Sequence, residues 1–363
     1  MNATSLFLVR FHGISAAIGL LALFATGSAL RAQSISMPYV TVGNPGNAGD
    51  PATASASGTF GSVSYTYDIG EYDVTYSQYC TFLNDVDPTG SNNLALFAPG
   101  GFLTLGIADA EDGISLNLGA ANGEKYSVIS GFASMPVVDV DYWSTLRFVN
   151  WMNNGEGNAS TETGAYTLIG GNTDRYGTPS NASSLLANPQ HNAGATVWLP
   201  NENEWYKAAY YDGANGTYST YATQSNTAPG NIIGSGSNEA NYYTGNGYSV
   251  TLSTSYSSGT NYLTAVGSFS GSASYYGTYD QSGDVYNWEA TTVGSQYPVI
   301  RGGGWGDPGT LYVSSSFWSS TDPTDGNVGI GFRVASVPEP NSIMLMLAGV
   351  AGLALMRGKP FKL

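Results

Sequence analysis

The chain has 363 residues with 26 acidic and 11 basic side chains, which gives a formal net charge of −15. A surface this acidic repels phosphate backbones, so nucleic acid is excluded as a partner, whereas it suits an exported protein and supplies oxygen ligands for Ca²⁺. The single cysteine, Cys80, excludes an intramolecular disulfide framework, and 48 Gly with 26 Tyr indicate a loop-rich, aromatic chain.

Residues 1–32 have the pattern of a secretory signal peptide. Arg10 precedes an apolar run from Ile14 to Leu30, and small residues ending in Ala32 follow. Because small and polar residues interrupt the end of this run, a lasting membrane anchor fits the segment less well. We predict cleavage after Ala32 and a mature domain over residues 33–336, which at about 300 residues is long enough for one large domain.

Three segments carry the start signals of helices. Thr75 precedes a helical pattern, and Gln78 three residues later completes a capping box. The pattern DYWSTLRFVNWMNN begins at Asp141. In LPNENEWYKAAYY, Asn201 is the expected N-cap and Glu204 completes a second capping box. We expect an amphipathic helix from each of these starts.

Short patterns of alternating side chains predict strands rather than further helices. They are YDIGEYDV at 67–74, PVIRGGGW at 298–305 and GIGFRVAS at 329–336. Two stretches rich in Gly, Asn, Ser and Thr, from the 90s to Gly123 and from Gly155 to Ala195, are typical of long surface insertions. These patterns together predict one large, loop-rich α+β domain.

Five blocks between Tyr67 and Ser336 resemble one protein family when they are taken in order. They are YDIGEYDVTYSQYCTFLN, MPVVDVDYWSTLRFVNWMN, VWLPNENEWYKAAYY, AVGSFSGSASYYGTYDQSGDVYNWEA, and VIRGGGWGDPG with GIGFRVAS. A single block such as RGGGW is a weak signal, but five in this order resemble the formylglycine-generating enzyme (sulfatase-modifying factor) family. The resemblance implies a C-type-lectin-like fold over residues 33–336.

Two arginines in these blocks are predicted to be buried structural anchors. Arg301 and Arg333 lie in a region with few basic residues, and arginine tolerates burial when its planar guanidinium is paired with carboxylates or carbonyls. In the same way, we expect Glu204 and Trp205 to serve helix capping and core packing rather than catalysis.

The resemblance also implies where catalysis would occur. Catalytic members of the family carry two cysteines after the glycine-rich strand, which bind Cu(I) and use oxygen to oxidise a substrate cysteine. Matched residue by residue, these positions hold Asp307 and Tyr312. Since Cu(I) requires soft thiolates, which an aspartate and a phenol do not supply, we expect no catalytic residue and no copper. Cys80 lies in a helical pattern and is predicted to be an inert core residue.

The sequence does not supply the histidines that iron-dependent or triad-based hydrolytic chemistry requires. Other branches of the family are called nonheme iron enzymes, and a facial triad requires two histidines and a carboxylate. Because His12 leaves with the signal peptide, the mature chain keeps His191 alone. We therefore expect no iron, and we interpret His191 as a solvated loop histidine rather than the base of a Ser-His-Asp triad.

The resemblance implies one metal site. In YGTYDQSGDVYNWEA the family places Ca²⁺ between a side-chain oxygen, two backbone carbonyls and an acidic side chain, and oxygen ligands of this kind suit Ca²⁺. The corresponding groups here are Asp280, the carbonyls of Gly283 and Val285, and Asn287. Asn287 stands where a glutamate is usual, so the site loses one charge. An Asx-type turn without an ion explains the same residues equally well.

Residues 337–363 resemble a PEP-CTERM sorting signal of Gram-negative bacteria. Pro338-Glu339-Pro340 is followed by the apolar run Ile343–Met356 and then by Arg357, Lys359 and Lys362. The basic tip suits a cytoplasmic end under the positive-inside rule. The resemblance implies a short transmembrane helix and processing at the motif by an exosortase. We expect a precursor anchored in the inner membrane and a product at the cell surface or outside the cell.

Three functions remain open at this point. The first is a non-catalytic surface or matrix protein that binds a ligand such as extracellular polysaccharide, since aromatic rings stack on sugars. Its cleft candidates are Trp305, Asp307, Tyr312 and Trp318. The second is an enzyme of unassigned reaction in which Asp307 performs acid–base chemistry. The third is a structural component of an extracellular matrix.

Overall fold

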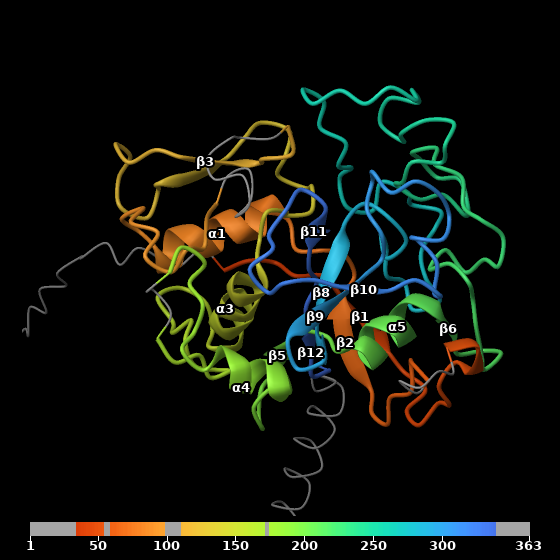
Figure 1. Ribbon diagram of the computed structural model, residues 1–363, viewed down its shortest axis with the longest axis horizontal. Helices are drawn as coiled ribbons and strands as arrows, with labels where there is room; N and C mark the ends of the chain where they lie inside the picture. Colours follow the sequence, from red (N-terminus) through yellow and green to blue (C-terminus); the bar gives the residue numbers. More distant parts are fainter. Residues whose placement is uncertain (1–33, 54–58, 99–109, 171–173, 339–363) are drawn as a thin grey trace, which may run out of the picture. The chain divides into compact units, whose positions relative to one another are not determined.

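The computed structural model describes residues 34–53, 59–98, 110–170 and 174–338 (Figure 1). All of them belong to one unit of the chain, Ala32–Leu363. The signal-peptide pattern and most of the C-terminal sorting segment, Glu339 and Pro340 included, lie outside the described residues. In the part of the chain that is described, no helix is long and apolar enough to cross a membrane.

The described elements alternate short strands with a few helices. In chain order they are β1 (Tyr39–Val42), a 3-10 turn (Pro51–Thr53), β2 (Tyr67–Gly70), α1 (Tyr76–Val86), β3 (Ile114–Leu116), β4 (Tyr126–Val128), α3 (Tyr142–Asn153), α4 (Ala182–Ala187), β5 (Val197–Trp198), α5 (Glu202–Tyr210), β6 (Tyr211–Asp212), β7 (Thr217–Tyr218), β8 (Tyr286–Val293), β9 (Tyr297–Arg301), β10 (Ser319–Ser320), β11 (Ile330–Gly331) and β12 (Ala335–Ser336).

Helices α1, α3 and α5 begin at the capping residues that the sequence predicts. The Thr75 side chain accepts a hydrogen bond from the Gln78 backbone N–H, and the Gln78 side chain accepts one in return from the Thr75 N–H at 2.8 Å. Asp141 Oδ1 accepts the Ser144 N–H at 2.7 Å, and α5 begins with the second predicted capping box. Each cap satisfies N–H groups of the first turn, which stabilises the helix by about 1 kcal/mol.

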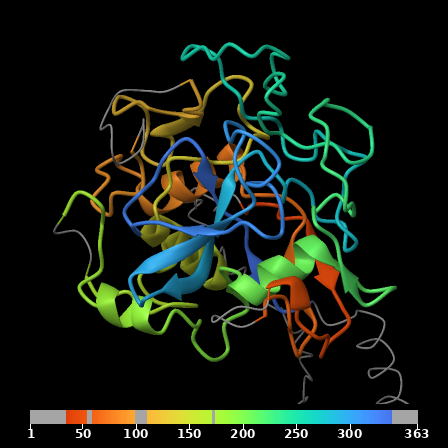
Figure 2. The same cartoon turned by 45° about the vertical axis from the view of Figure 1, so that its right-hand side comes forward.

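Within the described residues the strands form two four-stranded sheets and two hairpins. The first sheet has the order β1-β2-β12-β5, and every pairing in it is antiparallel. The second has the order β10-β9-β8-β11, and there β11 runs parallel to β8. Figures 1 and 2 show α1 and α3 on one side of these strands and α5 on the other.

Arg333 lies where the chain crosses from one sheet to the other. The predicted strand at 329–336 is two short strands, because β11 pairs with β8 in the second sheet and β12 pairs with β2 in the first. Between them, the Arg333 guanidinium donates to Asp73 Oδ1 at 2.8 Å and to Asn287 Oδ1 at 2.8 Å. Arg333 and Asp73 are both fully buried, so the prediction of a buried, paired anchor is confirmed.

One hydrophobic core joins α1 and α3 to strands of both sheets, with Trp143 and Trp151 among its largest side chains. Cys80 on α1 belongs to this core, and burial raises the pKa of its thiol to about 11. A thiol with so high a pKa stays protonated and unreactive at neutral pH, as predicted. Glu204 and Trp205 are fully buried as well, which confirms their predicted capping and core positions.

Residues 219–285 connect β7 to β8 without a regular helix or strand. In this segment, hydrogen bonds from buried side chains replace the backbone hydrogen bonds of regular strands. Asn231 donates to the Gly247 carbonyl at 2.8 Å, and Asn241 donates to Asp284 at 2.8 Å. Hydrogen bonds of this kind satisfy backbone and side-chain groups that regular structure would otherwise satisfy. The sequence patterns did not predict an irregular segment of this length here, and the insertions that they did predict contain β3 and α4.

Candidate ligand-binding cleft

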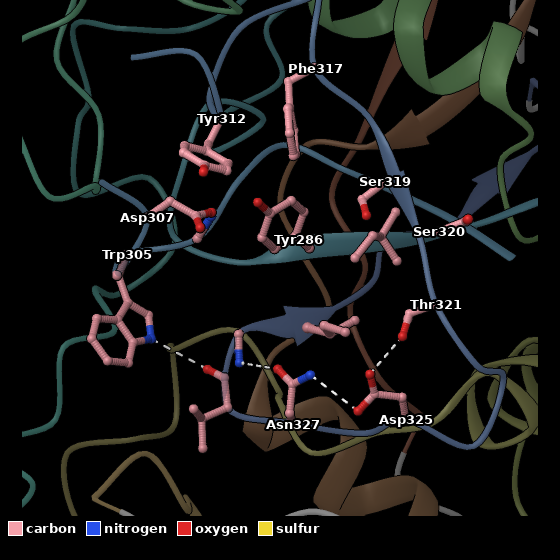
Figure 3. Close-up of a pocket in the computed structure, with 16 residues that line it drawn as sticks. Tyr286, Trp305, Asp307, Tyr312, Phe317, Ser319, Ser320, Thr321, Asp325 and Asn327 are labelled. Carbon is pink, nitrogen blue, oxygen red and sulfur yellow. Dashed lines mark hydrogen bonds between the residues drawn. The ribbon is translucent and has the colours of Figure 1, made fainter. Parts of the chain in front are cut away.

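A cavity of about 490 Å³ opens beside the second sheet, in the region where the sequence predicts a cleft (Figure 3). Its walls come from β8 to β11 and from the loops between β9 and β11. The lining residues are Tyr286, Ile300, Gly304, Trp305, Gly306, Asp307, Tyr312, Phe317, Ser319, Ser320, Thr321, Asp325, Asn327, Val328, Gly329 and Ile330. Small-molecule sites in proteins typically measure about 300–1,000 Å³, so the cavity has the size of a binding site.

The triple glycine after β9 brings the backbone close to Tyr312. Gly303 has a φ of 79°, and a Cβ added to it would lie 2.8 Å from the Tyr312 carbonyl oxygen. Glycine meets both conditions without strain, whereas other residues do not. The glycine-rich pattern therefore holds the Tyr312 backbone against the end of β9, and this places the phenol at the cleft.

The same turn holds Asp307. Its Oδ2 atom accepts a hydrogen bond from the Gly304 backbone N–H at 2.8 Å, and the Tyr286 hydroxyl donates another to the carboxylate. Burial raises the pKa of the Asp307 carboxyl, while these two hydrogen bonds act in the opposite direction. The carboxylate is thus partly desolvated, and it faces the cavity.

Figure 3 shows Tyr312 and Phe317, the aromatic wall, on one side of the cleft and Asp325 and Asn327, the polar wall, on the other. Tyr312 and Phe317 pack with their ring centroids 4.8 Å apart. Across the cavity, Asp325 accepts hydrogen bonds from the Thr321 hydroxyl at 2.7 Å and from the Asn327 amide at 3.3 Å. The sequence analysis missed this polar wall, because the pattern Asp-Pro-Thr-Asp-Gly-Asn by itself signals a turn and not a site.

Arg301 connects the segment that carries Phe317 to α5 through hydrogen bonds. Its Nε donates to Glu202 Oε1 at 2.5 Å, and its Nη1 donates to the carbonyls of Ser315 and Phe317 at 3.0 and 2.7 Å. The fully buried guanidinium also lies over the Tyr206 ring, 4.9 Å from its centroid. The predicted anchor role of Arg301 is confirmed. Its partner Glu202 was not predicted, since no local signal links two residues 99 positions apart.

Trp305 and Trp318 relate to the cleft in different ways. Trp305 is 8% exposed, donates from Nε1 to the Val328 carbonyl at 3.3 Å and stacks on Tyr262 at 4.9 Å. It is therefore a core residue that also lines the cavity. Trp318 is 39% exposed and is not among the lining residues. Phe317 lines the cleft and its neighbour Trp318 does not, so Trp318 is not part of the cleft for which it was a candidate.

Both positions at which the resemblance implies catalytic cysteines line the cleft, as Asp307 and Tyr312. Cys80 lies in the core on α1 and is not a lining residue. His191 is partly exposed and stacks on Trp198 at 4.7 Å, and it does not line the cleft either. A carboxylate and a phenol are hard, hydrogen-bonding groups and do not supply the thiolate pair that Cu(I) requires.

The four groups of the implied calcium site are Asp280, the carbonyls of Gly283 and Val285, and Asn287. Asn287 Oδ1 accepts hydrogen bonds from Trp205 Nε1 at 2.9 Å and from Arg333 Nε at 2.8 Å. Two donors occupy the lone pairs of this oxygen, and a guanidinium beside it repels a second cation. Asp280 Oδ2 accepts the Gly267 N–H at 2.7 Å. The residues present therefore do not fit the implied Ca²⁺ site, and in the described residues no group of three or more His, Cys, Asp or Glu could hold a metal.

Comparison with known proteins defines the class to which this fold and cleft belong. A family model described as the sulfatase-modifying factor enzyme 1-like domain (FGE-sulfatase) matches residues 51–337. The chain therefore belongs to this family, which is the one that its five sequence blocks resemble. No curated protein matches the chain.

Several solved structures are similar to this chain at low sequence identity. The crystal structure of CarF is 16% identical with a TM-score of 0.50, and the match covers 84% of this chain and 99% of that chain. Treponema denticola variable protein 1 is 17% identical with a TM-score of 0.47, over 85% and 97% of the two chains. PvdO from Pseudomonas aeruginosa is 18% identical with a TM-score of 0.41, over 83% and 92%. At these identities the likeness concerns the fold alone. The family match, together with the likeness to CarF, confirms the predicted α+β fold of the formylglycine-generating enzyme type.

Proposed function

We propose that this chain is an exported bacterial protein whose sulfatase-modifying-factor-like domain binds a glycan in the cleft and does not perform thiolate-dependent oxidation. One observation carries the proposal. The two positions of the implied cysteine pair, Asp307 and Tyr312, both line an open cavity, where they supply a hydrogen-bonding carboxylate and an aromatic face.

The composition of the cleft supports a sugar as the ligand. Aromatic rings offer flat faces on which pyranose rings stack, and hydroxyl, amide and carboxylate groups hydrogen-bond to sugar hydroxyls. Tyr312 and Phe317 supply the rings, and Ser319, Asp325 and Asn327 supply polar groups within the same cavity. A cavity with a few well-placed polar groups among aromatic side chains is the usual form of a small-ligand site.

Export and anchoring are proposed from the two ends of the sequence. The signal-peptide pattern at residues 1–32 and the motif Pro338-Glu339-Pro340 flank the domain. Strand β12 ends at Ser336, so a sorting segment beginning at residue 337 would follow the last strand directly. An exosortase cutting at the motif would therefore release the domain with all its strands, at the cell surface or into an extracellular matrix.

A second candidate function is an enzyme with an acid–base reaction in the same cleft. The observation that favours it is the partly desolvated Asp307 carboxyl, whose pKa burial raises, beside the Tyr286 hydroxyl. General acids and bases are tuned in this way. Incubating the protein with any glycan that it binds and analysing the products by mass spectrometry separates the two functions, because a binding protein returns the glycan intact.

The test of the first proposal is binding of the purified protein to a glycan array, with and without EDTA. We expect binding that Asp307→Ala and Tyr312→Ala each abolish while thermal unfolding stays cooperative. Leu311→Ala is the matched control, because Leu311 is exposed next to Tyr312 and does not line the cleft. A protein that binds no glycan contradicts the proposal, and so does one whose binding survives both cleft substitutions. So does conversion of a sulfatase cysteine peptide with Cu(I) and oxygen.

A further inference from the structure

The cleft contains negative charge without positive charge. Asp307 and Asp325 line it together with aromatic and neutral polar side chains, and no Lys, Arg or His is among the lining residues. The ion pairs found within the described residues leave both carboxylates out. Burial works against the ionised form of Asp307 by raising its pKa. A cation brought by a ligand would offset this cost of burial.

The basic side chains of the described residues are engaged elsewhere. Three are arginines paired with carboxylates, namely Arg147, Arg301 and Arg333. Lys125 donates to carbonyls of its own loop and Lys207 donates to the Asn44 carbonyl. Arg175, the remaining one, is exposed and lies over the ring of its neighbour Tyr176. Since none of these side chains lines the cleft, a ligand that carries a positive charge would supply the cation that the lining residues lack.

The aromatic wall favours the same kind of ligand. The faces of Tyr and Phe rings attract cations as well as the C–H faces of sugars. Tyr312 and Phe317 lie 4.8 Å apart in a tilted pair, and Tyr286, whose hydroxyl bonds Asp307, lies 6.4 Å from Phe317. A ring-shaped ligand on this wall would therefore hold one of its substituents beside the Asp307 carboxylate.

We propose that the cleft selects a sugar that carries a free ammonium group, with the nitrogen paired to the Asp307 carboxylate and the sugar ring on Tyr312 and Phe317. This inference rests on the proposed glycan-binding function and names the chemical class of its ligand. Neutral polar groups, Ser319, Thr321 and Asn327 among them, remain for the sugar hydroxyls. Uronic acids and sulfated sugars are disfavoured, because their charge repels Asp307 and Asp325 in a partly desolvated cavity.

The experiment is titration calorimetry of the purified protein with four probes of equal length. They are the β-1,4-linked trisaccharide of glucosamine, its fully N-acetylated counterpart, a uronic acid trisaccharide and the peptide trilysine. Short probes and an ionic strength of about 0.15 M limit non-specific adsorption to the acidic surface. Since a charge-assisted hydrogen bond is roughly twice as strong as a neutral one, we expect the glucosamine trisaccharide to bind about tenfold more tightly than the N-acetylated one.

Two variants locate the effect. Asp307→Asn keeps the shape of the side chain and removes its charge, so we expect the two trisaccharides to bind it with similar affinity. Glu124→Gln removes one charge from an exposed position that does not line the cleft, and we expect the tenfold preference to persist. Unchanged affinity of Asp307→Asn for the N-acetylated trisaccharide would show that the variant is folded.

The outcomes separate this inference from the proposed function. Equal or tighter binding of the N-acetylated or uronic acid probe overturns the ammonium preference and leaves glycan binding in place. A preference that Glu124→Gln weakens as much as Asp307→Asn also overturns it, since bulk charge would then be the cause. Binding of trilysine through Asp307 with no binding of any sugar overturns both the inference and the proposed function.

Discussion

The junction of the two sheets and the cleft differ in whether their charged side chains have a partner of opposite charge. At the junction, Arg333 is matched by Asp73 and by Asn287, and all three are buried. In the cleft, Asp307 and Asp325 face a cavity that no basic side chain lines. The two regions share strand β8, where Tyr286 lines the cleft and Asn287 belongs to the junction. Because successive side chains of a strand point to opposite faces, one strand serves both regions.

This difference indicates which charges hold the fold together and which are left for a ligand. A buried arginine with a complete set of partners holds segments together but presents nothing to solvent. A carboxylate held in place by a backbone N–H and a tyrosine, without a cation, is fixed in position and still lacks a counter-ion. The junction thus depends on a charge that is cancelled internally, and the proposed binding depends on a charge that is not.

The largest expected effect comes from removing the cation at the junction. Arg333→Met leaves Asp73 as an uncompensated buried carboxylate, so we expect the free energy of unfolding to fall by about 3–5 kcal/mol. Denaturant unfolding measures this loss. Arg175→Ala is the control, because Arg175 is exposed, and should change stability by less than about 0.5 kcal/mol. Combining Arg333→Met with Asp73→Asn should restore part of the loss. A single variant as stable as the wild type would show that the junction does not hold the sheets together.

Asp141 is an exception to this contrast, because it is a buried carboxylate without a paired cation. Arg147 is near it but does not form an ion pair with it. Its Oδ1 caps α3, its Oδ2 has no hydrogen-bond partner, and burial raises its pKa from 3.8 to about 7. Between these pKa values the folded state holds a proton that the unfolded chain has released. The free energy of unfolding should therefore rise as the pH falls from about 8 to about 4, by about 2–4 kcal/mol from this group.

The variant Asp141→Asn isolates that contribution. Asparagine caps helices as well as aspartate does and does not titrate. We expect the variant to be more stable than the wild type at alkaline pH and to show a weaker dependence of Tm on pH. Parallel Tm profiles for the two proteins between pH 4 and pH 8 would contradict the assignment, because the dependence would then come from other groups.

A smaller effect is expected where the glycine turn supports the cleft. Gly303→Ala places a Cβ close to the Tyr312 carbonyl at a positive φ, and strain of this kind costs about 1–3 kcal/mol. Tyr312 should shift, so glycan affinity should fall along with Tm. Gly259→Ala is the control, since nothing lies within 4 Å of an added Cβ there and Gly259 does not line the cleft. Loss of stability with unchanged glycan affinity would show that the glycine turn supports the fold but does not position Tyr312 for binding.

The smallest expected effect is that of calcium. A site with free Ca²⁺ at 100 times its Kd would stabilise the fold by about 2.7 kcal/mol. Because Asn287 Oδ1 already accepts two hydrogen bonds, one of them from Arg333, we expect no change in Tm between millimolar CaCl₂ and EDTA. A saturable rise in Tm that Asp280→Asn removes would show that the junction rearranges around an ion.

Strand β8 shows the limit of pattern reading in this chain. The sequence predicts a strand at 298–305, and β9 is found there, yet its partner Tyr286–Val293 was treated only as part of a family block. The segment YNWEATTV mixes polar and apolar residues without regular alternation, and its register with β9 shifts between Trp288 and Thr292. A bulge interrupts the two-residue period on which strand prediction rests. The pair Gly294-Ser295, which lies in the short turn after it, was the local sequence signal that could have revealed the hairpin.

The sequence by itself determined the features that depend on neighbours a few positions apart. Helix starts at Thr75, Asp141 and Asn201 follow from capping, which acts across three residues. Whether a thiolate pair is present is fixed by composition, since one cysteine cannot supply two thiolates.

The tertiary structure alone decided which groups meet across long separations. Arg333 and Asp73 are 260 positions apart, and Arg301 and Glu202 are 99 apart. Asp325 joins Asp307 at the cleft through packing of the second sheet. Such pairs form because burial requires each polar group to find a partner in space, and a partner in space has no fixed spacing in the chain.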